Sequence, residues 1–518
     1  MSRPRPLLYL LPPLVLSAWA FAPILANYFH GDDFQHLYMI ADGRVPEFLV
    51  TPHGGHMLVA RNALFVMSHA LFGVDPRGYF WVALLTHLLN VGLLYAAIVA
   101  FTGRRGLACG AAALWGISRL NADALGWYSV YGQAALTTIM LAVLWRLGRA
   151  ARDDRPLSRA AALGWYALVL VGTTCFGTGI GFALAAAPAV ALCLPGSAHR
   201  FTRRLFASLL LVVPLLYVLV QGLFRAASGY AHDSVSSPMA ALTAGLLVPI
   251  MAVHLVVFGL GQLLIGTWLP DVAYPGPTHV ALAAGVGLMM LVALASGAPR
   301  DRRAILACLL LGVGAYGIIA LGRGMLGGNQ PWILASIATQ IRYHYAPLVP
   351  LVVAGCVALH VLVPRLPARA GGVVLAVWLA ALTAGLWHQP PVIDHYDDER
   401  RQVAMLHQVV AMRVAQSPAS GPAYVPNRRM NPVNIFTPME VFPGWAGLFI
   451  VYYPDDIVDG RTVRFIDPVP ARVTAARARP GTRTAELLVT RAESGRLPPR
   501  QRPKHEAGPQ SAPAAGPQ

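Results

Sequence analysis

Two adjacent aspartates follow the first long apolar stretch of the sequence. Asp32 and Asp33 stand in segment 30–34 (HGDDF), directly after the apolar run 7–27. Two like charges at a low-dielectric boundary repel each other, which raises the pKa of one carboxyl group unless a cation compensates. Such a pair can act as a general base or bind a divalent metal such as Mg²⁺ or Mn²⁺. The alternative is a solvated loop with two ordinary aspartates.

The elements that must position these residues are membrane helices. The 518 residues are 56% hydrophobic and 12% charged, with a mean hydropathy of +0.55, which excludes an ordinary soluble enzyme. Twelve apolar stretches approach the length needed to cross a hydrocarbon layer of roughly 30 Å. The predicted fold class is therefore an all-α polytopic membrane protein with about 11–13 transmembrane helices. The stretches begin near Leu7, Tyr79, Leu107, Ala124, Ala160, Gly179, Leu205, Ala240, His279, Ala304, Ala346 and Gly371.

The formal charge of +17 reflects membrane topology better than nucleic-acid binding, because the arginines form small groups between apolar stretches. With the N-terminus inside, the groups at 3–5, 104–105, 146–159 and 200–204 all lie on the cytoplasmic side. Those at 300–303 and 365–369 would lie outside if 240–269 crossed the membrane once. We therefore predict that 240–269 is a broken pair or a re-entrant segment.

The chain divides into three parts. Residues 1–388 form the predicted transmembrane domain, with 28–78 as a long first external loop. Its second half, 57–72, has the apolar spacing of an interfacial helix. Residues 389–495 form a small soluble α+β segment, in which 394–401 opens a helix and 446–465 has two strand-like runs. Residues 496–518 have the composition of a disordered tail.

Four segments also match, in order, the motifs of a known family: GDDFQHL (31–37), RNALFVMSHALFGVDPRGYFWVALLTHLLNVGLLY (61–95), NADALGWYS (121–129) and RYHYAP (342–347). They resemble membrane glycosyltransferases of the GT-C fold that use polyprenyl-phosphate sugars. The resemblance is to glycosyltransferase family 39 and its transmembrane and tetratricopeptide-repeat-containing mannosyltransferases. Asn121 replaces the histidine of the family pattern, Asp123 replaces its glutamate, and the repeats are absent.

The resemblance implies roles for individual residues. Asp32 or Asp33 would be the base or a metal ligand, and Asp123 would be the supporting carboxylate. Arg342 would bind the donor phosphate, because its planar guanidinium can engage two phosphate oxygens, and Arg323 is a second candidate. Tyr343 would accompany Arg342 in binding the donor phosphate. Arg61 and His87 would orient the loop and its neighbouring helix.

The predicted function is transfer of a sugar from a polyprenyl-phosphate donor to a cell-envelope glycan, lipid or protein, with inversion, at the outer face of the membrane. One alternative is an O-antigen ligase or polymerase, which would use external arginine and histidine. Another is a non-enzymatic flippase or transporter for lipid-linked sugars, which predicts repeated halves with broken helices, and no such symmetry is seen. Arginine supplies almost all the positive charge, Lys504 being the single lysine, which favours a bacterial inner membrane. The sugar, the acceptor, metal dependence and oligomeric state stay open.

Overall fold

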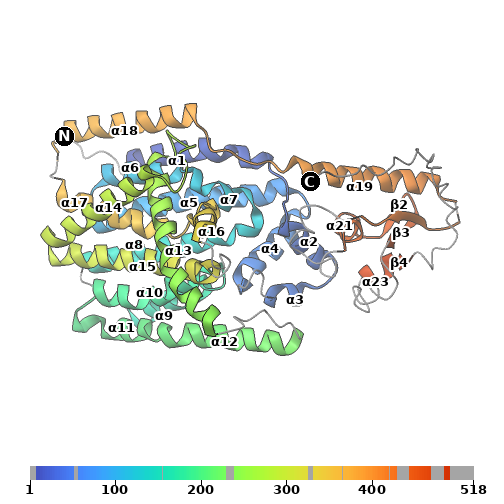
Figure 1. The fold of residues 1–518 in the computed structure, drawn as a ribbon, viewed down its shortest axis with the longest axis horizontal. Coiled ribbons are helices and arrows are strands. Elements are labelled where there is room, and N and C mark those ends of the chain that lie inside the picture. Colours follow the sequence, from blue (N-terminus) through green and yellow to red (C-terminus); the bar gives the residue numbers. More distant parts are fainter. Residues whose placement is uncertain are drawn as a thin grey trace, which may run out of the picture.

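The described part of this computed structural model is mainly helical. It comprises residues 7–51, 57–153, 156–228, 238–324, 331–363, 366–418, 420–428, 443–467 and 483–490. Figure 1 shows a helical bundle at one end and a smaller part with strands at the other. The short helices α2, α3 and α4 lie between the two.

Each of the twelve predicted apolar stretches contains a helix, so the chain is a multi-pass helical membrane protein. Eight helical stretches in the described residues are long and apolar enough to cross a membrane. The helices in which these stretches mainly lie are α1 (Leu7–Phe21), α5 (Pro76–Thr102), α8 (Gly132–Asp153), α11 (Arg200–Ala207) with α12 (Leu209–Ser228), α13 (Pro238–Ile265), α14 (Pro277–Ser296), α15 (Pro299–Gly324) and α18 (Ala368–His388).

The other four predicted stretches are shorter helices, so the count of 11–13 spans depends on whether these also cross. They are α6 (Arg105–Gly116), α9 (Arg159–Gly172), α10 (Thr178–Cys193) and α17 (Leu348–Leu362). The fourth apolar stretch forms a long helix only from Gly132, not from Ala124. The residues before it form the short helices η2 (Arg119–Asn121), α7 (Ala122–Gly126) and η3 (Tyr128–Val130).

Small residues let the central helices approach closely. A Cβ atom on Gly181 of α10 would lie 2.0 Å from the carbonyl oxygen of Gly314 on α15. A larger residue at Gly181 would force the two backbones apart. Close approach through small residues is common between membrane helices. Asn90 of α5 adds polar links within the bundle, because its amide donates to the Ala134 oxygen at 3.0 Å and accepts from Thr138 at 2.7 Å.

Most of the long apolar stretch 240–269 belongs to one helix, α13, which contains Pro249 and ends at Ile265. It is not a broken pair within its described residues, and in Figure 1 it runs across the other helices of the bundle. The alternative of a re-entrant segment stays a prediction.

Arg104 donates to the carbonyl oxygens of His360 and Val363, which joins the end of α5 to the end of α17. The opposite ends of these two helices, at Pro76 and Leu348, adjoin the segments that carry the predicted site.

The long loop predicted at 28–78 contains α2 (Asp32–Ala41), α3 (Val45–Val50) and α4 (Val59–Phe72). The predicted helix at 57–72 is present, but its polar side chains Arg61, Asn62 and Ser68 are buried. Asn62 donates to the Phe48 carbonyl oxygen at 2.6 Å. This helix therefore packs against the protein with its polar face. A helix lying only in the membrane interface would expose that face to water.

The C-terminal segment, residues 397–490 where described, begins with α19 (Asp397–Gln416), which confirms the helix predicted to open at 394–401. Strand β3 (Arg461–Asp467) pairs in parallel with β1 (Ala423–Pro426) and β4 (Leu488–Thr490), and antiparallel with β2 (Ile457–Val458). The α+β composition is as predicted. The disordered tail predicted at 496–518 lies outside the described residues.

One predicted strand-like run is wrong: residues 445–452 form the helix α21 (Trp445–Tyr452). The amide N–H of Ala446 donates to the Asn427 side chain at 3.0 Å, which satisfies a backbone donor in its first turn. Nearly all of its residues are buried, and a short apolar run buried on every side has no periodicity that separates helix from strand.

Candidate functional site

The Asp33 side chain is fully buried in the first turn of α2, close to the end of the first membrane helix. Its Oδ1 accepts a hydrogen bond from the Ser129 hydroxyl at 2.5 Å, and its Oδ2 accepts one from the His30 backbone N–H at 3.0 Å. Burial raises the pKa of Asp33 to about 6, although both hydrogen bonds and the nearby His30 oppose the shift. Asp32 is only partly buried, and its charge raises the pKa of Asp33 further.

At Gly31 the chain changes direction between the end of the first membrane helix and α2. Its φ of +53° lies in the region that residues with a side chain rarely adopt. A Cβ atom there would also lie 3.6 Å from the Trp127 ring. The position of Asp33 therefore depends on a glycine two residues before it.

A chain of buried polar side chains continues from Ser129 to Arg61. The Ser129 oxygen lies 3.0 Å from His36 Nδ1, and Arg61 Nη1 lies 3.3 Å from His36 Nε2. Arg61 Nη1 also lies 3.1 Å from His36 Nδ1. If Ser129 gives its hydroxyl proton to ionised Asp33, a hydrogen bond between Ser129 and His36 needs a proton on Nδ1, and Nε2 is then the nitrogen that accepts from Arg61. Burial lowers the pKa of Arg61 to about 10, against the charges of Asp32 and Asp33, so this arginine is still a cation at neutral pH.

His30 connects this network with the C-terminal segment. Its Nδ1 lies 2.5 Å from Glu399 of α19, and its ring stacks on Tyr396 with 4.1 Å between ring centroids. The Trp127 indole donates to the His30 carbonyl oxygen at 3.0 Å. Burial lowers the pKa of His30, but the hydrogen bond and charge of Glu399 outweigh it, so the pKa is raised overall.

Asp123 and Arg342, predicted to act together, are neighbours in the structure. Asp123 lies on α7, and Arg342 lies on the short helix η6 (Ile341–Tyr343). Burial raises the pKa of Asp123, while the charge of Arg342 and a hydrogen bond from its backbone lower it. The Arg342 guanidinium lies 5.5 Å from the centre of the Trp127 ring and 5.4 Å from that of Tyr343.

Trp127 joins the two halves of the site, since it contacts both Arg342 and His30. Arg323 reaches the same region from α15, with its guanidinium 5.8 Å from the Tyr343 ring. The structure thus brings together the predicted residues Asp33, Asp123 and Arg342, with Tyr343 and Arg323 beside them. Their roles in binding or catalysis stay predictions.

His87 lies elsewhere, in the interior of α5. Its Nε2 donates to the Gly116 carbonyl oxygen at 2.8 Å, so its Nδ1 accepts from the Tyr345 hydroxyl at 2.9 Å. Tyr345 belongs to the same RYHYAP segment as Arg342. His87 therefore anchors the segment that carries Arg342, and within the described residues its hydrogen bonds go to Gly116 and Tyr345 rather than to the carboxylates.

A metal at Asp32 and Asp33 would need ligands that the described residues do not assemble. Both oxygens of Asp33 already accept hydrogen bonds. Among the described residues no group of three or more histidine, cysteine, aspartate or glutamate side chains is placed to bind a metal ion. Mg²⁺ or Mn²⁺ at this pair stays a prediction.

Sequence reasoning missed Ser129, His36, Glu399 and Tyr396 as members of the site. Ser129 closes the segment NADALGWYS, two residues after Trp127, so its neighbourhood was recognised without its role. Glu399 and Tyr396 lie more than 350 residues from Asp33 in the chain, and no local pattern links them to it.

Comparisons with known proteins complete the description of the site. No protein-family model matches the chain, and no curated protein matches it. The solved crystal structure of ArnT from Cupriavidus metallidurans bound to undecaprenyl phosphate is similar to it at 17% sequence identity and a TM-score of 0.47, covering 92% of this chain and 89% of that chain. The resemblance to GT-C glycosyltransferases therefore stays an expectation from the four sequence segments.

Proposed function

We propose that this protein is a membrane glycosyltransferase that transfers a sugar from a polyprenyl-phosphate donor to a hydroxyl of a cell-envelope acceptor. The observation that carries the proposal is a buried carboxyl group, Asp33, whose pKa is about 6, at the same end of the bundle as the Asp123–Arg342 pair. A general base works best when its pKa is near the operating pH, and an ordinary surface aspartate has a pKa of about 3.9.

In the proposed reaction the acceptor oxygen attacks the anomeric carbon of the sugar while the bond from that carbon to the phosphate oxygen breaks. Asp33 takes the proton of the acceptor hydroxyl. The bonding electrons leave with the phosphate, and polyprenyl phosphate is released with its negative charge. A single displacement of this kind inverts the anomeric centre.

Arg342 would neutralise the phosphate as charge accumulates on it. Its guanidinium is partly exposed, and the rings of Trp127 and Tyr343 flank it. Preorganised cations of this kind stabilise a transition state because they need no reorientation during the reaction. Asp123 keeps the Arg342 backbone in place through its hydrogen bond.

The network behind Asp33 supports its role as the base. Ser129, His36 and Arg61 orient one carboxylate oxygen, and a backbone N–H orients the other. A carboxylate bound in this way keeps a fixed direction toward its substrate, which is what proton transfer requires. The outer face of a bacterial inner membrane is the proposed location, as the sequence analysis predicts.

The test uses the full chain, purified in detergent, with a set of polyprenyl-phosphate sugars that differ in the sugar. The expected result is release of polyprenyl phosphate from one donor in the presence of acceptor lipid or glycan extract, and no release with Asp33→Asn. Absence of release from every donor, by protein that is folded and monodisperse, would contradict the proposal. Movement of intact lipid-linked sugar across vesicles without its cleavage would favour the transporter instead.

A further inference from the structure

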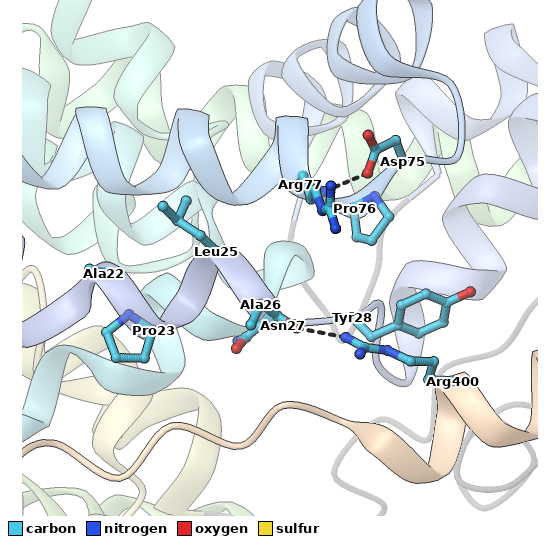
Figure 2. Close-up of a pocket in the computed structure, with 10 residues that line it drawn as sticks. All are labelled: Ala22, Pro23, Leu25, Ala26, Asn27, Tyr28, Asp75, Pro76, Arg77 and Arg400. Atoms are coloured by element: carbon cyan, nitrogen blue, oxygen red, sulfur yellow. Dashed lines mark hydrogen bonds between the residues drawn. The ribbon is translucent and has the colours of Figure 1, made fainter.

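A cavity of about 590 Å³ opens at the surface between the first and second membrane helices, away from Asp33. One wall is η1 (Ala22–Ala26), which ends the first candidate span, and the other is the start of α5 around Pro76. Figure 2 shows Arg77 and Arg400 at its edge, on opposite sides. Asp33, Asp123 and Arg342 do not line it.

The polar part of this cavity is predominantly cationic. Arg400 donates to the Ala26 carbonyl oxygen at 2.6 Å and lies over the Tyr28 ring, 5.4 Å from its centre. Arg77 is exposed, and only its backbone N–H is engaged by the Asp75 carboxylate, at 3.0 Å. The lining carries two guanidinium groups and one carboxylate, and Arg400 also lies 3.9 Å from the carboxylate of Asp397, which is exposed and is not part of the lining.

Two lipid-facing rows of apolar side chains lead to the cavity. On α1 the row is Leu8, Leu11, Val15 and Trp19, exposed by 63, 58, 54 and 42%. Their spacing of three or four residues places them on one helix face, which continues to Ala22 and Pro23 in the cavity wall. On α5 the row is Trp81, Leu85 and Leu89, exposed by 49, 57 and 52%, and Arg77 precedes Trp81 by four residues on the same face.

We propose that this cavity binds the head group of an anionic glycerophospholipid from the surrounding membrane, with its acyl chains along these two rows. The volume lies within the range of small-molecule sites, roughly 300–1,000 Å³. Guanidinium groups suit a phosphate diester, and basic pockets between membrane helices are known to bind anionic head groups. A zwitterionic head group has the same phosphate diester, but it also brings a cationic group to a lining that already holds two guanidinium groups.

The site joins the membrane helices to the C-terminal segment, because Arg77 begins α5 and Arg400 belongs to α19. Arg400 directly follows Glu399, whose carboxylate contacts His30 beside Asp33. A phosphate bound between Arg77 and Arg400 therefore stabilises the end of α19 that helps to position the site at Asp33. The proposal is independent of the proposed transferase function, since it concerns stability and lipid binding.

The test measures the melting temperature of the full chain in detergent with dioleoyl phosphatidylglycerol or dioleoyl phosphatidylcholine added. Phosphatidylglycerol is expected to raise the melting temperature by about 3 °C or more, and phosphatidylcholine by much less. The double variant Arg77→Gln/Arg400→Gln should lose that difference. The matched control Arg149→Gln/Arg152→Gln, which removes two exposed arginines of α8, should keep it.

Three results would overturn the proposal. Equal stabilisation by the two lipids would remove the head-group specificity, and an equal loss in the control variant would show a general charge effect. Displacement of phosphatidylglycerol by equimolar undecaprenyl phosphate would identify the cavity as part of the donor site instead.

A second measurement covers the case in which the double variant does not fold. The five native cysteines are all buried, so Ala22→Cys introduces an exposed thiol into the cavity wall. Phosphatidylglycerol should slow labelling of this thiol by a charged maleimide several-fold, while phosphatidylcholine should not. The same labelling rate with both lipids would contradict the proposal.

Discussion

The Ser129 hydroxyl donates to Asp33 Oδ1 at 2.5 Å, although the two residues are 96 positions apart in the chain. This hydrogen bond joins the loop at 28–78 to the turn before α8. Burial raises the pKa of Asp33, and this hydrogen bond lowers it. The acidity of Asp33 therefore depends in part on a residue from another part of the sequence.

Replacing Ser129 should change the pH dependence of sugar transfer. Asp33 must be ionised to act as a base, so wild-type activity should rise with pH, with a midpoint near the Asp33 pKa of about 6. Ser129→Ala removes a hydrogen bond to the ionised form and should move this midpoint upward by about 1–2 pH units. Rate profiles between pH 4.5 and 9 would measure it. Ser129→Thr retains the hydroxyl and should keep the wild-type midpoint.

The two adjacent aspartates should respond differently to the same change. Asp33→Asn removes the proposed base and should reduce transfer by a factor of about 100 or more, the usual range for general base catalysis. Asp32→Asn should retain activity, and its pH midpoint should fall because the charge of Asp32 raises the pKa of Asp33. Initial rates of both purified variants test this. If Asp32→Asn is inactive and Asp33→Asn is not, the roles are reversed.

Substitution of Arg342 should mainly affect use of the donor. Arg342→Gln removes the cation and should lower kcat/KM for the lipid-phosphate sugar by about 10- to 100-fold, the value of a charge-assisted hydrogen bond. Arg342→Lys keeps the charge but lacks the planar guanidinium, so its kcat/KM should lie between those of the wild type and Arg342→Gln. The Arg323 guanidinium lies over the same Tyr343 ring, and Arg323→Gln should lower kcat/KM less than Arg342→Gln does. A loss confined to protein yield, with unchanged kcat/KM, would mean that Arg342 has only a structural role.

Glu399 should influence the site from outside it. Glu399→Gln removes the charge that raises the pKa of His30, so His30 loses its proton at lower pH. Because the His30 charge lowers the pKa of Asp33, the pH midpoint of activity should shift upward. Asp398→Asn, an exposed acid on the same helix whose side chain is 81% accessible, serves as the control and should not shift it. An identical profile for both variants would show that α19 does not act on Asp33.

Apolar length and charge in the sequence were enough to determine the class of this protein. A run of about 20 apolar residues favours the membrane over water, and a helix satisfies all of its backbone groups within the one segment. All twelve stretches are helical for this reason. A helix within the long loop at 28–78 was also predictable, and motif resemblance placed Asp123 and Arg342 in the same candidate site.

The tertiary structure alone decided which aspartate is buried and what surrounds it. Asp32 and Asp33 are chemically identical neighbours, and only the direction of the helix turn places Asp33 against Ser129 and leaves Asp32 partly exposed. Glu399 reaches His30 because α19 folds back on the first loop, and the arginine-lined cavity forms where residues 22–28, 75–77 and 400 meet. Local propensity and hydropathy contain no information on such long-range contacts, because they depend on how the whole chain packs.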